Sequence, residues 1–329
     1  MNYKPILITA GEPNSIFIEI LIKSLIKKKF KSPIVLIVSK KVLELQMSKL
    51  KLDYPFEILT EKDLFKNKLN NKKLNIINIE YNSQKAFEKI STKSNKYLKE
   101  CFNLAIKLIK LGLTNKFING PISKKHFLTN KFLGITEYLA KKTNAKSYAM
   151  LIYNKQLSVC PITTHLPIKH VAKNISKKII INKILLINNF YIRHFNFKPK
   201  IAVTGLNPHC ESVDSFNEDN RIIEPAIKFL KKKINIKGPF SADTIFLRKN
   251  REKFNLIIGM YHDQVLAPIK TINEFDSINI TTGLPFLRLS PDHGPNYRMA
   301  GKNKSNPQSL LNSIKFLDNI NWKLKLKKV

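Results

Sequence analysis

The sequence lacks long apolar runs, paired cysteines and glycine-rich nucleotide-binding fingerprints. No apolar run among its 329 residues approaches the ~18 residues of a membrane-spanning helix. The short apolar stretch near the N-terminus stops at Gly11 without a cleavage site, so we expect no secretory signal. The three cysteines, Cys101, Cys160 and Cys210, form no C-x-x-C pair and predict reduced thiols in the cytoplasm.

Glycine is missing where the common phosphate-binding motifs need it. The loop at residues 11–15 begins with a glycine but does not continue as the G-x-G-x-x-G turn of a Rossmann dinucleotide site. A Walker A phosphate loop and a G-x-S-x-G nucleophile elbow are absent as well. These absences exclude the most familiar nucleotide-binding and serine-hydrolase signatures.

Acidic residues are scarce. Asp and Glu number 23 against 58 Lys and Arg, which gives a formal net charge of +35. One interpretation is nucleic-acid binding. The other is compositional bias, because Lys, Asn and Ile are abundant throughout and no basic motif interleaved with glycine or aromatic residues occurs. We therefore expect no nucleic-acid partner and no membrane association, although a positive field would attract an anionic substrate.

Short apolar runs alternate with longer amphipathic stretches, which predicts an α/β protein with a largely parallel sheet. Strands are expected near residues 5–9, 34–38, 74–79, 116–119, 148–153, 158–163, 200–204, 255–260 and 278–282. Helices are expected near residues 16–28, 167–189 and 222–232. A further long helix should be capped by Ser83, carry Phe87 and Ile90 on its apolar face and close at Gly112.

Polar clusters follow several of the predicted strands. Ligands of open α/β sheets bind outside the carboxyl ends of the strands, so these clusters predict a functional edge. His165, His209 and His262 each follow a strand, and three imidazoles could hold a catalytic divalent metal while leaving a position for substrate. The alternative is that each histidine is a capping or hydrogen-bonding residue, because their long spacing does not establish that they converge.

Three further side chains each allow two interpretations. Asp243 is either the N-cap of a predicted helix or a carboxylate near the metal. Asp263 is either a neighbour of the metal site or an ordinary turn residue. Arg288 stands in a lysine-rich chain, which indicates either bidentate binding of a carboxylate or phosphate, or a surface ion pair.

Taken together, these segments resemble the 4-hydroxythreonine-4-phosphate dehydrogenase family of pyridoxal phosphate biosynthesis, over nearly the whole chain. The resemblance is carried, in order, by residues 8–13, 119–124, 134–140, 163–167, 205–209, 238–244, 261–264 and 279–285. It implies two α/β/α domains like those of isocitrate and isopropylmalate dehydrogenases, with the active site in the interdomain cleft at a dimer interface. Residues 1–126 and 278–329 would form the first domain, and residues 127–277 the second, which would carry the metal ligands and the dimer contacts.

The resemblance also implies roles for individual residues. The metal ligands would be His165, His209 and His262, and the metal would be zinc, magnesium or cobalt. Catalytic roles would fall to Asp243, Asp263 and Lys270, and substrate binding to Thr136, Lys270, Asn279 and Arg288. NAD or NADP would bind at Asp292, His293, Gly294, Gly301 and Asn306. Each active site would be shared by the two subunits of a homodimer.

The reaction implied is oxidation of 4-phosphohydroxy-L-threonine by NAD or NADP to 2-amino-3-oxo-4-phosphooxybutanoate, which decarboxylates to 3-amino-2-oxopropyl phosphate. The sequence departs from the family at several positions. Ile135 stands where the family has a substrate-contacting histidine, residues 210–215 contain no glycine, and Val265 replaces a glycine. A sister dehydrogenase of a phosphorylated sugar acid, such as 4-phospho-threonate or 4-phospho-erythronate, and a relative that no longer catalyses are the alternatives.

Overall fold

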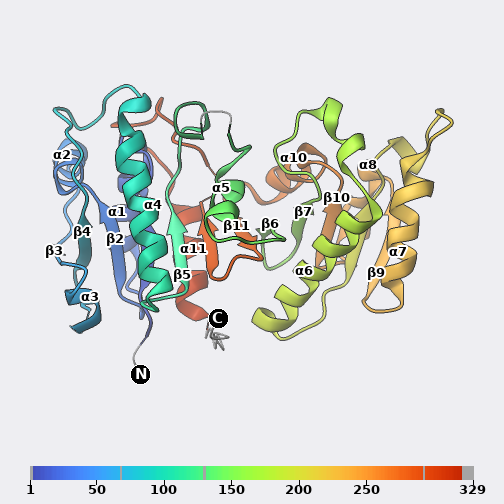
Figure 1. Cartoon of the computed structure of the whole chain (residues 1–329), viewed down its shortest axis with the longest axis horizontal. Coiled ribbons are helices and arrows are strands. Elements are labelled where there is room, and N and C mark those ends of the chain that lie inside the picture. Colours follow the sequence, from blue (N-terminus) through green and yellow to red (C-terminus); the bar gives the residue numbers. More distant parts are fainter. Residues whose placement is uncertain (1–2, 67–68, 129–130, 292, 321–329) are drawn as a thin grey trace. The chain divides into compact units, whose positions relative to one another are not determined.

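The chain divides into two units, each built on its own run of strands (Figure 1). The computed structural model describes residues 3–66, 69–128, 131–291 and 293–320. The first unit comprises the chain up to Ile135 and from Phe286 onward, and the second unit spans Thr136–Pro285. The sequence predicted seams at 126/127 and 277/278. The structure thus assigns residues 127–135 to the first unit and residues 278–285 to the second.

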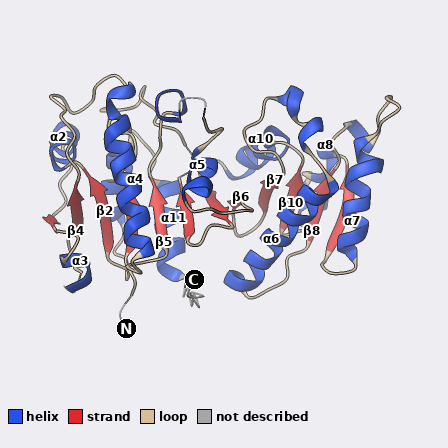
Figure 2. Cartoon of the chain, viewed as in Figure 1, coloured by secondary structure: helices blue, strands red, loops and turns tan. Residues whose placement is uncertain are grey.

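The strands of the first unit run in the order β3-β4-β2-β1-β5-β12, and each pair is parallel. Its elements are β1 (Ile6–Thr9), α1 (Phe17–Lys27), β2 (Ile34–Val38), α2 (Lys40–Leu50), β3 (Phe56–Ile58), α3 (Asp63–Lys66), β4 (Leu74–Asn78), α4 (Asn95–Lys110), β5 (Lys116–Asn119), β12 (Leu287–Ser290) and α11 (Gln308–Asn319). Both β1 and β2 are buried along their whole length. That is typical of parallel strands covered by helices, among which α4 crosses in front of the strands (Figure 2).

The strands of the second unit run in the order β11-β6-β7-β10-β8-β9. Its elements are α5 (Ile135–Lys142), which begins at the seam, β6 (Ala149–Tyr153), β7 (Ser158–Pro161), α6 (Lys177–Phe195), β8 (Ile201–Thr204), α7 (Glu224–Lys231), β9 (Ile236–Phe240), α8 (Ala242–Ile245), α9 (Arg248–Arg251), β10 (Leu256–Gly259), α10 (His262–Asn273) and β11 (Ile278–Thr282). Strand β6 runs antiparallel to both β11 and β7, whereas β7, β10, β8 and β9 pair in parallel. The prediction of an α/β protein with a largely parallel sheet is confirmed.

The long helix predicted after Ser83 begins later than expected. Helix α4 starts at Asn95, and the Ser83 hydroxyl instead donates to the carbonyl oxygen of Lys85 at 2.8 Å. Tertiary contacts hold the preceding segment out of the helix, because the Glu88 backbone N–H donates to Asn14 Oδ1 at 2.8 Å. Phe87 packs beside Gly301 rather than on an apolar helix face. The predicted closure at Gly112 is confirmed, since this residue follows the helix with a φ of 85°.

Within the described residues, no helix combines the length and the hydropathy that a membrane span requires.

Candidate metal and substrate site

The three candidate ligand histidines leave neighbouring strands of the second unit at one edge. Strand β10 pairs in parallel with β7 on one side and with β8 on the other. Parallel strands end at the same edge of a sheet, at a spacing of about 4.8 Å. His165 follows β7, His262 follows β10 and His209 follows β8, so the predicted functional edge is present.

His165 lies against a carboxylate that the sequence analysis did not single out. Its Nδ1 is 3.8 Å from Oε2 of Glu137, in the first turn of α5. The hydroxyl of Thr164 donates to Oε1 of Glu137 at 3.0 Å. Burial acts to raise the pKa of the Glu137 carboxyl, but the His165 ring and the Thr164 hydroxyl outweigh it and hold that pKa below its usual value. Glu137 is therefore a carboxylate beside an imidazole.

His262 has an acidic neighbour of its own. It is the first residue of α10, and its Nδ1 lies 2.6 Å from Oδ1 of Asp263. A carboxylate at Nδ1 favours the tautomer with its proton on that nitrogen, which leaves Nε2 as the ligating atom. The rings of His165 and His262 are 5.8 Å apart between centroids. The structure thus brings two of the three predicted ligands together.

His209 lies on a loop with an unusual backbone. His209 and Cys210 have φ angles of 55° and 62°, in the left-handed region that residues with side chains seldom occupy. The fully buried Asp219 carboxylate anchors this loop, because it accepts the backbone N–H groups of Leu206 at 2.8 Å and Asn207 at 3.1 Å. In the described part of the chain, no three His, Cys, Asp or Glu side chains are gathered closely enough to hold a metal ion.

Asp243 lies in the first turn of α8 and is exposed. The N-cap of that short helix is Ser241, so the N-cap interpretation of Asp243 is wrong. The carboxylate lies beside the His209 loop: burial, then Asp219 and Asp243, raise the pKa of the Cys210 thiol. Asp243 is therefore near one predicted ligand loop, whereas Asp263 contacts another ligand directly.

Two predicted substrate residues of the second unit meet at one strand. Thr136, which is buried in α5, places its hydroxyl oxygen 3.4 Å from that of Thr281 in β11. Asn279 lies two residues before Thr281 and so on the same face of β11. Its Oδ1 is buried with no hydrogen-bond partner among the described residues, which suits an acceptor kept for a ligand. Lys270 is exposed on α10, the helix that begins with His262.

Arg288 lies in β12 of the first unit and is 1% exposed, so the surface ion-pair interpretation is wrong. Its Nε donates to Oδ1 of Asn119 at 2.6 Å, at the end of the adjacent parallel strand β5. This bond sets the plane of the guanidinium. Asn119 belongs to one of the polar clusters that the sequence placed after a strand.

The predicted cofactor residues lie between β12 and α11 in the first unit, apart from Asp292, which lies outside the described residues. One side of this stretch is held: Pro295 O accepts the backbone N–H of Ile16 at 3.2 Å. Asn306 Oδ1 accepts the backbone N–H of Gln308 at 2.9 Å. A Cβ on Gly294 would meet no atom of the described residues within 4 Å, so open space adjoins the described part of the stretch there. The stretch is therefore anchored at Pro295 and Asn306 and open at Gly294.

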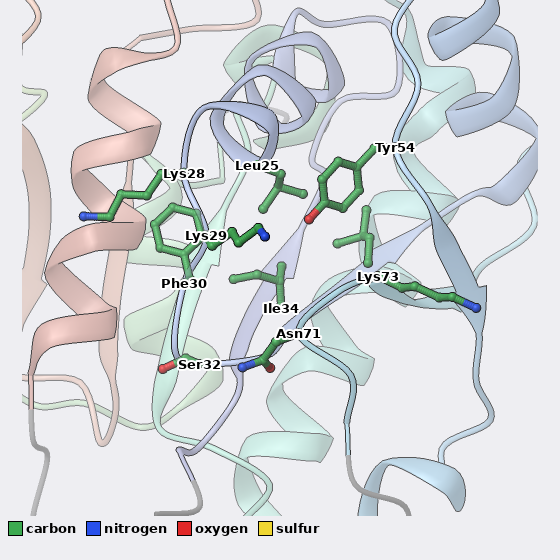
Figure 3. A pocket seen from close by; sticks show the side chains of 10 residues that line it. Leu25, Lys28, Lys29, Phe30, Ser32, Ile34, Tyr54, Asn71 and Lys73 are labelled. Carbon is green, nitrogen blue, oxygen red and sulfur yellow. The ribbon is translucent and has the colours of Figure 1, made fainter.

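One pocket of the first unit lies away from all of these residues (Figure 3). It lies where β2 and β4 begin, beside Ile34 and Leu74, and so at the opposite edge from the carboxyl ends of the strands. Lys29 and Tyr54 point into it, while Lys28 points away (Figure 3). None of the predicted site residues lines it. We do not assign this pocket to the candidate site.

Sequence reasoning missed the residues that hold the ligand loops in place. Besides Glu137 and Asp219, Gln264 joins the ends of β8 and β10: its Nε2 donates to the Gly205 carbonyl oxygen at 2.8 Å, and its Oε1 accepts the backbone N–H of Met260 at 2.6 Å. Two sequence signals could have indicated them. Gln264 directly follows Asp263, and Glu137 directly follows Thr136; both preceding residues were predicted site residues. Asp219 is an acidic residue near the loop that carries His209, and a carboxylate can accept the backbone N–H groups of such a loop.

The comparisons with known proteins agree on one family. The sequence pattern of the pyridoxal phosphate biosynthetic protein PdxA matches residues 29–317. A 4-hydroxythreonine-4-phosphate dehydrogenase of Sulfurihydrogenibium sp. is 39% identical, over 93% of this chain and 95% of the relative. A D-threonate 4-phosphate dehydrogenase of Pectobacterium atrosepticum is 33% identical, over 65% of this chain and 67% of the relative.

Solved structures agree with these relatives. The 4-hydroxythreonine-4-phosphate dehydrogenase of Klebsiella pneumoniae superposes with a TM-score of 0.80 at 27% identity, covering 95% of this chain and 98% of that chain. Isocitrate dehydrogenase of Methylococcus capsulatus has a TM-score of 0.52 at 8% identity, covering 95% and 84%. The latter is a likeness of fold alone, and it confirms the predicted fold class.

Proposed function

The chain belongs to the PdxA family of pyridoxal phosphate biosynthetic proteins, and we propose that it is a 4-hydroxythreonine-4-phosphate dehydrogenase. The reaction would oxidise the secondary alcohol of 4-phosphohydroxy-L-threonine to a ketone. The resulting β-keto acid would lose carbon dioxide to give 3-amino-2-oxopropyl phosphate. The observation that carries the proposal is the pair of carboxylate-backed imidazoles, His165 and His262, at the carboxyl ends of adjacent strands.

The substrate carries two anionic groups, a phosphate and a carboxylate, and the proposed contacts suit both. The Arg288 guanidinium and the Lys270 ammonium would hold phosphate and carboxylate, since both side chains are cations with several donors. Thr136 and Asn279 would add hydrogen bonds, Asn279 through the buried oxygen that has no partner in the described structure. Asp243 or Asp263 would take up or relay the proton of the substrate hydroxyl.

The proposed activity needs a divalent metal and NAD or NADP. His165, His209 and His262 would hold zinc, magnesium or cobalt, and the imidazole set suits such ions. When bound, the metal would lower the pKa of the substrate alcohol and the nicotinamide would accept hydride. His293, Gly294, Gly301 and Asn306, with Asp292, would bind the adenosine part of the dinucleotide.

We further propose that the protein is a homodimer in which the two subunits share the active sites, and that it works in the cytoplasm. The support for a shared site is the family to which the chain belongs. The three cysteines are all free thiols, as suits a reducing compartment.

His209→Ala tests the proposal directly. Because the imidazole would be a metal ligand, the change should abolish turnover and lower the bound metal together. His170→Ala is the matched control, since this exposed histidine of the second unit has no assigned role. Turnover with retained metal in the His209 variant would refute the ligand assignment.

A second candidate is oxidation of D-threonate 4-phosphate. It is favoured by the Pectobacterium relative. Ile135, which stands at the start of α5 where the family has a substrate-contacting histidine, is compatible with either substrate. Comparing kcat/KM for the two phosphorylated substrates separates the candidates. Ile135→His should raise kcat/KM for 4-phosphohydroxy-L-threonine if that is the native substrate. A preference for the threonate ester would favour the sister activity.

A further inference from the structure

Two buried polar atoms of the second unit face each other without a hydrogen bond. They are Nδ1 of His165 and Oε2 of Glu137, 3.8 Å apart. Neither atom has a hydrogen-bond partner among the described residues, although the side chains are only 20% and 13% exposed. Buried polar atoms normally have a hydrogen-bond partner, because leaving them unsatisfied destabilises the fold, so their juxtaposition calls for a function.

The Glu137 carboxylate is held in place from the other side. Its Oε1 accepts the hydroxyl of Thr164, the residue that directly precedes His165. Glu137 also lies in the first turn of α5, where the helix dipole stabilises a negative charge. The carboxylate is therefore fixed by the chain segment that carries the imidazole, and a shift of about 0.6 Å would bring the pair within hydrogen-bond distance.

We propose that Glu137 is the positioning residue of His165: it accepts the Nδ1 proton and so aims Nε2 at a divalent metal ion. The proposal rests on the metal site of the proposed function. Ligating histidines commonly donate their second ring N–H to a carboxylate, which fixes the tautomer and the ring orientation. His262 already has this arrangement with Asp263 at 2.6 Å. Glu137 gives His165 the same support.

A rival role for Glu137 is to balance the charge of Lys183. This lysine lies on α6, donates to the Ile162 carbonyl oxygen at 2.5 Å and is close enough to Glu137 to interact electrostatically. The two roles predict different results. A mere counter-ion would affect folding stability, whereas a positioning residue would also set the affinity for metal.

The test is metal affinity of the full-length protein, measured by competition between Zn²⁺ binding and a chromophoric chelator. Glu137→Gln keeps the shape but removes the charge, and it should weaken Zn²⁺ binding about 10- to 100-fold. Glu137→Asp keeps the charge but withdraws the carboxylate from Nδ1 by one methylene, so it should recover little of the affinity, whereas a counter-ion role would be largely restored. Glu224→Gln is the matched control, because this exposed glutamate on α7 makes the same charge change and should have no effect.

Unchanged Zn²⁺ affinity in Glu137→Gln, with lowered thermal stability, would overturn the proposal in favour of the counter-ion role. If Glu137→Gln does not fold, Thr164→Val removes the hydroxyl that holds the carboxylate and should weaken Zn²⁺ binding in the same direction. No substrate or NAD enters this measurement. Weakened metal binding in a protein without dehydrogenase activity would therefore refute the proposed function and still support the role of Glu137.

Discussion

At the residue scale, Arg288 shows how burial separates two interpretations that the sequence left open. Its scarcity in a lysine-rich chain indicated bidentate chemistry or a surface ion pair, and its 1% exposure rejects the second. The bond from its Nε to Asn119 fixes the guanidinium plane. A planar, always charged donor fork in a strand is a suitable anchor for a phosphate or carboxylate.

Arg288→Lys should therefore raise KM for the phosphorylated substrate at least about tenfold, because an ammonium lacks the planar fork. Steady-state kinetics with varied substrate measure this. Arg248→Lys is the control, since that side chain is 81% exposed and pairs only with Glu252 among the described residues. An unchanged KM in a folded Arg288→Lys protein would contradict a role in substrate binding.

The pH dependence of folding stability tests whether burial raises the pKa of the Glu12 carboxyl. The side chain is 2% exposed, and burial raises the pKa of its carboxyl, although Ser94 Oγ donates to it at 2.9 Å. At pH values between 4.5, the ordinary pKa, and the raised pKa, Glu12 keeps its proton in the folded chain but has lost it in the unfolded chain. Stability should thus fall as pH rises through that window, and above it the buried charge is a cost.

Glu12→Gln removes this charge and keeps an acceptor for Ser94. The variant should be more stable than the parent at pH 7, and the difference should shrink towards zero at pH 4. Urea unfolding at the two pH values measures it, with Glu44→Gln on the exposed face of α2 as the control. A difference that grows as pH falls would contradict the assigned cause.

At the element scale, the sequence predicted the bounds of strands most accurately where nearly the whole strand is buried. Strand β2 matches the predicted residues, because a short, wholly apolar run bounded by turn residues is typical of a buried parallel strand. Strands β5 and β11 match the predicted residues as well, although polar side chains make up half or more of each. Strand β9 was missed because it contains Gly238 and Pro239, and β12 because it carries Arg288. The predicted start of α4 was wrong because Asn14, which is distant in the sequence, accepts a hydrogen bond from the backbone N–H of Glu88 in the segment before the helix.

Part of the candidate site was predictable from the sequence, because its residues follow predicted strands. A histidine after each of three strands is visible in the sequence. The order β7-β10-β8, which makes these strands neighbours, is not visible there, and neither is the contact between Glu137 and His165. One departure from the family also has a structural account: Val265 is fully buried, and its Cγ1 fills the space that a side chain at Gly259 would need.

The loop that carries His209 depends on one carboxylate. Asp219 accepts two backbone N–H groups and the Asn207 side chain. Asp219→Asn removes the charge from a fully buried acceptor, so we expect a loss of about 1.5–3 kcal/mol in unfolding free energy and weaker metal binding.

Urea unfolding and chelator competition measure both effects. Asp214→Asn, at an exposed position of the following loop, is the matched control. Metal affinity equal to that of the parent in a destabilised Asp219→Asn protein would show that the loop does not need this anchor to present His209.

At the scale of the whole molecule, the proposed roles fall on both units. The histidines, Thr136, Asn279 and Lys270 belong to the second unit, whereas Arg288 and the cofactor stretch belong to the first. Neither unit alone carries all of the residues to which we assign a role. The net charge of +35 suits a protein that attracts an anionic phosphate ester, in agreement with the family to which the chain belongs.

The most direct measurement of the central claim is NADH formation, followed by absorbance, with 4-phosphohydroxy-L-threonine as substrate. It is run on the full-length protein before and after a chelator, and again after zinc or magnesium is added back. We expect turnover that the chelator abolishes and the metal restores. Turnover that survives complete removal of metal, or no turnover from folded, metal-loaded protein, would contradict the account.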